Sequence, residues 1–214
     1  MRKINSKELQ EILKAHRLWV ESEGQRGHKA DLSQVDLQEA DLSYIDLSGV
    51  DLSGVDLSET GLFKADLRGA NLREANLSGV NLSFAGLTGA SLPGADLTGA
   101  NLRGADLREA NLYGASLSGA DLSETDLCGA DLSDANLSEA NLRGINLSYA
   151  YLSKANLSRA NLYGVNLSRA TLFYADLREA DLRVATAKDC RILEAKFSSL
   201  KEKARLMMLG AREV

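Results

Sequence analysis

The chain has 214 residues, of which 44% are hydrophobic but only 5% aromatic, and its formal net charge is −5 at neutral pH. We therefore expect an aliphatic core, and the acidity argues against direct binding to nucleic-acid phosphates. The chain has no apolar run long enough for a membrane helix, and its charged start does not resemble a secretory signal. The two cysteines, Cys128 and Cys190, cannot form a disulfide framework, so a reducing, cytoplasmic location is predicted.

Residues 1–29 are predicted to form a capping helix followed by a linker. Asn5 is placed to be the N-cap, with Glu8 three residues later, as in a capping box. One helical face carries the residues Leu9, Ile12, Leu13, His16, Trp19 and Val20. We expect this face to pack on the region that follows, with His16 at its rim rather than acting as a ligand.

A strict five-residue repeat begins after this helix. From Leu32 to Leu182 every fifth residue is leucine, over 31 consecutive positions. A small or β-branched residue stands two positions before each leucine, and Asp, Asn, Ser or Thr usually lies between them. The second of the remaining two positions is Gly in 13 units, which is typical of a turn.

This spacing excludes both a regular helix and an unbroken strand. In an α-helix, steps of five rotate successive leucines by about 140°, which spreads them around the cylinder. In a strand, five is odd, so successive leucines would alternate between faces. All leucines can point inward only if each unit is a short strand followed by a turn, so the chain must coil and its coils must stack as parallel strands. The small residues keep this coil narrow, without room for a ligand channel.

The unit A-(D/N)-L-x-x resembles the pentapeptide-repeat family over residues 30–199. The resemblance implies an all-β solenoid: a right-handed quadrilateral parallel β-helix with four pentapeptides per coil. With short helices capping the ends, the chain divides into 1–29, 30–199 and 200–214.

The C-terminal segment is predicted to be a second helix that starts at Ser198 or Ser199 and runs to about Leu209. Its apolar stripe consists of Leu200, Ala204, Met207 and Met208. Two interpretations remain open: the stripe caps the last coil, or it joins two copies as a homodimer. Gyrase-acting members of the family, which this chain resembles, dimerise through their C-terminal ends.

No catalytic, cofactor or metal site is predicted. His16 and His28 both precede the repeat and lack metal-ligand spacing with another His or Cys. The serines stand at turn positions, where they form turns rather than act as nucleophiles. Cys128 is expected to be exposed on a turn, and Cys190 to point inward.

Acidic residues are concentrated at the start of the repeat. If a coil contains four units, three pairs of carboxylates lie above one another: Asp31/Asp51, Asp36/Asp56 and Asp46/Asp66. Like charges this close cost on the order of 1 kcal/mol even in water. Either Asp is the default residue of the repeat, tolerated because it is solvated, or these coils are an acidic patch for a basic partner. Further along, Asn takes the same position and removes the repulsion.

Aromatic residues form two groups, which we place on outward turns. The first group is Tyr44, Phe63 and Phe84; the second is Tyr113, Tyr151, Phe173 and Tyr174. Exposed aromatic clusters are typical of interfaces. Each group is either a contact surface or a packing element against neighbouring turns and caps.

The predicted function is that of a non-enzymatic protein-interaction or scaffold module whose partner the sequence does not name. An alternative, by resemblance, is a DNA-mimicking regulator or protector of DNA gyrase. Gyrase-acting members commonly carry Phe at the inward centre and loops that break the coil, whereas this chain carries Leu without insertions. A purely structural rod is a third alternative.

Overall fold

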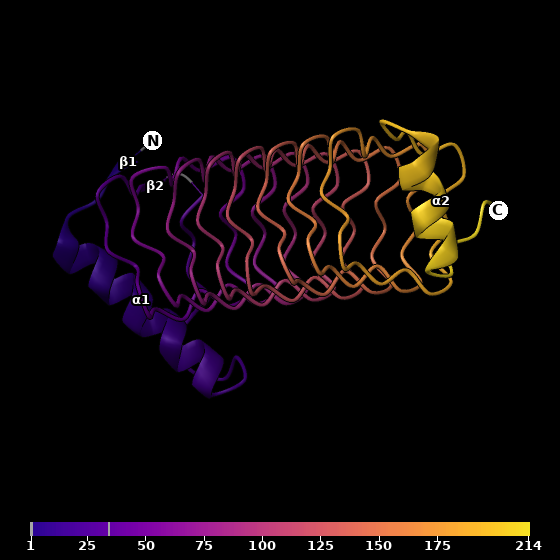
Figure 1. The fold of residues 1–214 in the computed structure, drawn as a ribbon. Helices are drawn as coiled ribbons and strands as arrows, with labels where there is room; N and C mark the ends of the chain where they lie inside the picture. Colours follow the sequence, from indigo (N-terminus) through magenta and orange to yellow (C-terminus); the bar gives the residue numbers. More distant parts are fainter. Residues whose placement is uncertain (1, 34) are drawn as a thin grey trace.

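The computed structural model describes residues 2–33 and 35–214. A long coil lies between two helices, one at each end (Figure 1). The elements in chain order are β1 (Arg2–Lys3), α1 (Ser6–Glu21), β2 (Val35–Asp36) and α2 (Leu200–Met208).

Each coil contains 20 residues. Bridged residues such as Asp41 and Gly61 lie 20 positions apart and are parallel, and this register recurs along the repeat. The N–H of Leu42 donates to the carbonyl of Gly61 (2.8 Å), and the N–H of Gly61 donates to the carbonyl of Ala40 (2.9 Å). Four pentapeptides therefore make one coil, whereas the right-handed sense of the coil stays a prediction. We number the faces one to four from the units centred on Leu32, Leu37, Leu42 and Leu47.

Where a unit carries Asp or Asn at the outward strand position, that side chain can also form the turn that follows it. The side chain of Asp51 accepts a hydrogen bond from the N–H of Ser53 (3.0 Å), two residues later. The N–H of Val55 donates to the carbonyl of Leu52 (3.2 Å) and closes the turn, in which Gly54 has a φ of 65°. The sequence pattern predicted turns from Ser and Gly alone and did not predict this turn-forming role of Asp and Asn.

The interior is aliphatic, as predicted. All 31 leucines of the repeat are buried, and nearly all of the small residues that precede them are buried too. The exceptions, Ala40 and Ile45, lie in the first coil, and at the other end Ala195 and Phe197, which continue the register past Leu182, are also only partly buried. The tube is filled along its length and becomes accessible only where it ends.

At the N-terminal end, α1 lies obliquely across the coil and continues past its edge (Figure 1). Asn5 is the N-cap and accepts from the N–H of Glu8 (2.9 Å). The prediction of a rim position for His16 is wrong, because its side chain is fully buried. The linker folds back over the helix, where the N–H of Ala30 donates to Nδ1 of His16 (3.3 Å).

At the C-terminal end, the chain first crosses the coil as α2 and then adds to the coil as an extended segment. Ser199 is the N-cap of α2, and Leu206 is its buried residue. Beyond the helix, Arg212 forms a parallel bridge with Arg191. The N–H of Ile192 donates to the carbonyl of Arg212 (2.9 Å), so the end of the coil receives backbone partners.

Candidate interaction surfaces

The predicted acidic pairs lie in neighbouring coils. Asp31 is bridged to Asp51, and Asp46 to Asp66. In the third pair, Nε2 of Gln38 donates to the carboxylate of Asp56 (3.3 Å) and links the unit of Asp36 to the coil above. All six side chains remain at least partly exposed. We call residues 31–66 the acidic first coils.

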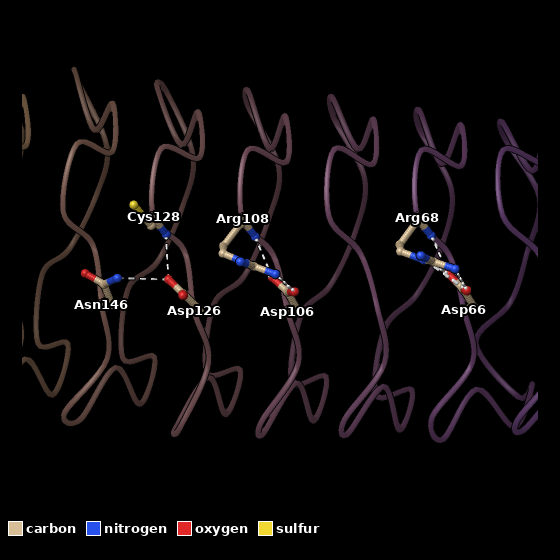
Figure 2. Close-up of polar contacts among 7 residues, drawn as sticks. All are labelled: Asp66, Arg68, Asp106, Arg108, Asp126, Cys128 and Asn146. Carbon is tan, nitrogen blue, oxygen red and sulfur yellow. Dashed lines mark hydrogen bonds and ion pairs between the residues drawn. The ribbon is translucent and has the colours of Figure 1, made fainter.

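Carboxylates on the outer strand position are stabilised in two ways (Figure 2). An arginine two residues later binds the carboxylate, as Nε of Arg108 does on Asp106 (2.8 Å). Alternatively, an asparagine one coil above donates its amide, as Nδ2 of Asn146 does to Asp126 (3.0 Å). The hydrogen bond from Arg108 is the main reason that the pKa of Asp106 is lowered to about 2. Without an arginine, hydrogen bonds from the hydroxyl and N–H of Ser53 still lower the pKa of Asp51.

Side-chain amides form ladders along the axis of the coil. In each bond the upper residue donates to the lower one: Asn141 to Asp121 (2.9 Å) and Asn161 to Asn141 (3.2 Å). An ionised Asp has no hydrogen to donate. Asp51 above Asp31 therefore lacks this bond and also adds a like charge. In the acidic first coils, two bridged pairs of carboxylates take the place of the ladder, and one further pair, Asp106 and Asp126, is stacked in the same way farther along the coil.

The first predicted aromatic group is one contiguous cluster. The ring of Phe63 makes edge-to-face contacts with Tyr44 (centroids 5.4 Å apart) and Phe84 (6.1 Å). Nζ of Lys64 lies 5.3 to 6.0 Å from the three ring centroids. Tyr44 and Phe84 are 68% and 50% exposed. These four residues on face three are the N-terminal aromatic cluster.

The second predicted group is not a cluster. Among the described residues, the rings of Tyr113, Tyr151, Phe173 and Tyr174 make no contact with one another. The placement of Tyr151 on a turn is wrong, because it takes the strand position normally held by Asp or Asn and is bridged to Asp131 and Thr171. Phe173 instead lies beneath the guanidinium of Arg191, at 5.2 Å.

Two tyrosines that the sequence did not single out, Tyr149 and Tyr163, make three contacts with arginines. The guanidinium of Arg169 lies 5.4 Å from the ring of Tyr149 and donates to its hydroxyl (2.6 Å). Tyr163 lies between Arg143 (5.1 Å) and Arg183 (5.8 Å). Each arginine is 20 residues from its tyrosine in the sequence. A search for Tyr and Arg one coil length apart would therefore have found these contacts.

The stripe predicted on α2 faces outward. Leu200 is 85% exposed and Met208 88%, and Ala204 and Met207 are exposed as well. Leu206, which the prediction omitted, is the residue that packs inward. The role of the stripe in dimerisation stays a prediction.

The described part of the chain contains no group of His, Cys, Asp and Glu side chains arranged to hold a metal ion. None of its helices has the length and apolarity to cross a membrane. Cys190 is buried, and burial raises the pKa of its thiol to about 12. Cys128, which we expected to be exposed, is half-buried, and the hydroxyl of Ser148 donates to its sulfur (3.5 Å).

These features define a solenoid whose interior is uniform and whose outer faces vary. The family model of pentapeptide repeats matches the chain at residues 30–69, 62–99, 95–134, 135–172, 150–186 and 166–199. The chain therefore belongs to the pentapeptide-repeat family. None of the curated protein sequences matches it.

Solved structures similar to this chain are also pentapeptide repeat proteins. HetL, involved in heterocyst differentiation regulation in the cyanobacterium Nostoc sp. strain PCC 7120, is 34% identical, with 91% of each chain covered and a TM-score of 0.48. Rfr23 from the cyanobacterium Cyanothece 51142 is 31% identical, covering 56% of this chain and 62% of its own, with a TM-score of 0.32. QnrB1, a plasmid-mediated fluoroquinolone resistance protein, is 17% identical, with coverage of 74% and 94% and a TM-score of 0.41.

Proposed function

We propose that this chain is a non-enzymatic scaffold that binds a partner protein through its outer faces, with the N-terminal aromatic cluster as the central contact. Along the residues that the structure describes, the interior is filled by leucine and small side chains, which favours recognition through the outer faces. A cytoplasmic location remains the sequence-based prediction.

The observation that carries this proposal is the grouping of exposed rings around one cation: Nζ of Lys64 lies 5.3 to 6.0 Å from the three ring centroids of the cluster. Tyr44 and Phe84 adopt φ values of 62° and 59°, at the turn position where the repeat most often has Gly. A side chain in this left-handed region costs roughly 1–2 kcal/mol. Half or more of each side chain remains exposed, so burial does not offset this cost. Other residue types, such as Glu74 and Arg159, share this left-handed turn position. The cluster differs from them because it groups exposed aromatic residues beside a cation, an arrangement typical of binding hot spots.

Replacing both rings with the residue that the repeat prefers tests the proposal. Tyr44→Gly/Phe84→Gly should keep or raise thermal stability, because the turn strain is removed, while capture of the partner from native cells is lost. The matched control is Tyr149→Gly/Tyr174→Gly, which removes two rings at the same turn position but outside the cluster. Equal capture by the wild-type protein and the cluster variant would contradict the proposal.

Regulation or protection of DNA gyrase is the second candidate, and the acidic surface supports it. Residues 31–139 contain 19 acidic and five basic residues, a charge distribution that suits a DNA mimic over this N-terminal part of the rod. Residues 140–214 contain seven acidic and 13 basic residues, which limits mimicry to part of the rod. A gyrase supercoiling assay tests this candidate: neither inhibition nor protection at micromolar protein would eliminate it.

We further propose that α2 forms the contact of a homodimer. Leu200 and Met208 expose apolar side chains at an end of the rod, where a second copy has free access. Light scattering should give a dimer for the wild-type protein and a monomer for Leu200→Ser/Met208→Ser. A monomeric wild-type protein would eliminate this proposal. A protein without any captured partner would support the purely structural rod.

A further inference from the structure

The strands of the coil depend on the coil below them for hydrogen bonds. The N–H of Gly61 donates to the carbonyl of Ala40 (2.9 Å), and its carbonyl accepts from Leu42 (2.8 Å). Asp66 on face four is bonded in the same way: its N–H donates to the carbonyl of Ile45 (2.9 Å). Each outward strand residue thus uses both of its peptide groups toward the N-terminal side.

The first coil has no such partners on faces three and four. Asp41 and Asp46 take the positions of Gly61 and Asp66 one coil lower. Within the part of the chain that the structure describes, the N–H and carbonyl groups of Asp41 and Asp46 make no backbone hydrogen bond. We call residues 41–43 and 46–48 the open edge. An edge of this kind is a template for another strand.

The chain itself shows which segment this edge accepts. On face two, β1 lies against the same edge as a parallel strand, with Arg2 opposite Val35 and Lys3 opposite Asp36. This short strand is extended and basic, and its partner Asp36 is acidic. The chain then enters α1, so the edge beyond Asp36 stays open.

A groove lies between α1 and the open edge, with a volume of about 430 Å³. Its apolar side chains include Leu9, Leu13, Ala40 and Ile45. Its charged side chains are Asp36, Glu39 and Asp41, without a basic residue among the lining residues. The groove continues past Ile45 toward Asp46, where Lys14, Arg17 and Glu21 line the helical side. The stretch beside face three thus combines an apolar floor with an acidic rim.

We propose that residues 41–43 of the open edge, on face three, bind an extended segment of a partner protein in which basic and aliphatic residues alternate. The segment adds a parallel strand below the first coil and continues the line of β1. Because side chains alternate in direction along a strand, its aliphatic residues meet Leu13 and Ile45 while its basic residues meet Glu39 and Asp41. This inference rests on the proposed function, since it identifies one kind of segment that the scaffold recognises.

A fluorescent synthetic peptide of alternating lysine and valine, added to the full-length protein, tests the inference. Fluorescence anisotropy should show saturable binding. An analogue with N-methyl groups on alternate backbone nitrogens should bind at least about tenfold more weakly, because it cannot pair as a strand. In hydrogen exchange, the amide of Asp41 should exchange rapidly in the free protein and become protected by the lysine–valine peptide.

Two double variants separate the groove from general electrostatics. Glu39→Gln/Asp41→Asn removes two charges from the rim and should weaken binding by about tenfold. Glu139→Gln/Asp121→Asn removes two charges from equivalent turn and strand positions far along the rod, and should leave binding unchanged.

The inference is overturned if the peptide does not bind, if the N-methylated analogue binds equally well, or if the amide of Asp41 stays unprotected. It is also overturned if both double variants weaken binding equally. Failure here is distinguishable from failure of the proposed function. If the open edge does not bind the peptide, partner capture that depends on Tyr44 and Phe84 can still be observed. If the aromatic cluster is not the partner contact, the peptide can still bind at the open edge.

Discussion

The two ends of the rod differ in how their exposed strand edges obtain backbone hydrogen-bond partners. At the C-terminal end the chain returns after α2, and the carbonyl of Gly210 accepts from the N–H of Asp189 (2.9 Å), next to the bridge between Arg191 and Arg212. At the N-terminal end β1 covers only Val35–Asp36, and α1 crosses the rest obliquely (Figure 1). A helix covers apolar side chains, but its backbone groups are already bonded internally. Only an extended segment completes a strand edge, so the N-terminal end remains partly open.

The largest effect is expected at the closed end. Leu206→Ala removes the buried side chain of α2 and should lower the free energy of unfolding by about 2–5 kcal/mol, because a cavity remains between the helix and the last coil. The control Met208→Ala, at an 88% exposed position, should change stability by less than about 0.5 kcal/mol. Urea unfolding followed by circular dichroism measures both. Equal effects would show that α2 is not held by Leu206.

The second prediction concerns the fit of α1 and its linker. A Cβ on Gly27 would lie 2.1 Å from the carbonyl oxygen of Ala15, and its φ of 69° is left-handed. Gly27→Ala should therefore destabilise the N-terminal end by about 2–4 kcal/mol, through strain together with overpacking. Fluorescence of Trp19, the single tryptophan, reports on this helix during urea unfolding.

A matched glycine isolates the steric contribution. Gly54 has a similar φ of 65°, but a Cβ there meets nothing within 4 Å. Gly54→Ala should cost only about 1–2 kcal/mol. Similar costs for the two variants would mean that the linker moves aside and that the N-terminal end is looser than its packing indicates.

The third prediction uses pH to loosen the N-terminal end alone. Burial lowers the pKa of His16 below its ordinary value, and nearby Lys29 acts in the same direction while Asp46 opposes it. The neutral ring accepts from the N–H of Ala30, and the protonated ring cannot. The stabilisation from His16 is thus complete above the unfolded pKa of about 6.5 and is lost as the pH falls through the lower folded pKa.

Trp19 makes this change visible, because its ring stacks on His16 at a centroid distance of 5.8 Å. Its fluorescence should change as the pH falls below about 6.5. His28→Gln should retain this change, and His16→Gln should remove it. A transition that persists in His16→Gln would assign the pH dependence to another group.

The register of the leucines was sufficient to predict the interior, because only a chain that turns every five residues can bury Leu32 and Leu37 together. The ends were not predictable in the same way. His16 was misplaced because the helical pattern does not show that the linker folds back over it. On α2 the sequence offers apolar residues on more than one side, and the structure buries Leu206 rather than Leu200 or Met208.

The outer surface was predictable where it depends on the 20-residue register and not where it depends on side-chain geometry. The stacking of Asp46 on Asp66 and the grouping of Tyr44 with Phe63 follow from that register alone. The turn bond from Ser53 to Asp51 requires a particular side-chain conformation, which composition does not specify. Tyr149 and Arg169 are 20 residues apart, so the same register also predicts their contact, although a pattern confined to one repeat unit does not show it.

The smallest effect concerns the ladders, and it distinguishes the acidic first coils from the coils above. Asp51→Asn leaves an oxygen to accept from Asn71 and supplies an amide that donates to Asp31, while it also removes one of two stacked charges. Stability should rise by about 0.5–1 kcal/mol, from a new hydrogen bond together with reduced repulsion. Asp96→Asn is the control, because Asp96 stands above Asn76 and gains only the hydrogen bond.

Thermal unfolding at low and high salt separates the two contributions. At low salt Asp51→Asn should stabilise more than Asp96→Asn, and the excess should disappear in high salt because solvated charges are screened. A gain at Asp51 that matches Asp96 at every salt concentration would show that the stacked carboxylates do not repel measurably. The acidity of the first coils would then impose no cost on the fold, and its persistence there would need no functional explanation. A salt-sensitive excess would instead show that these coils retain their charges at the expense of stability, as expected of a surface that binds a basic segment.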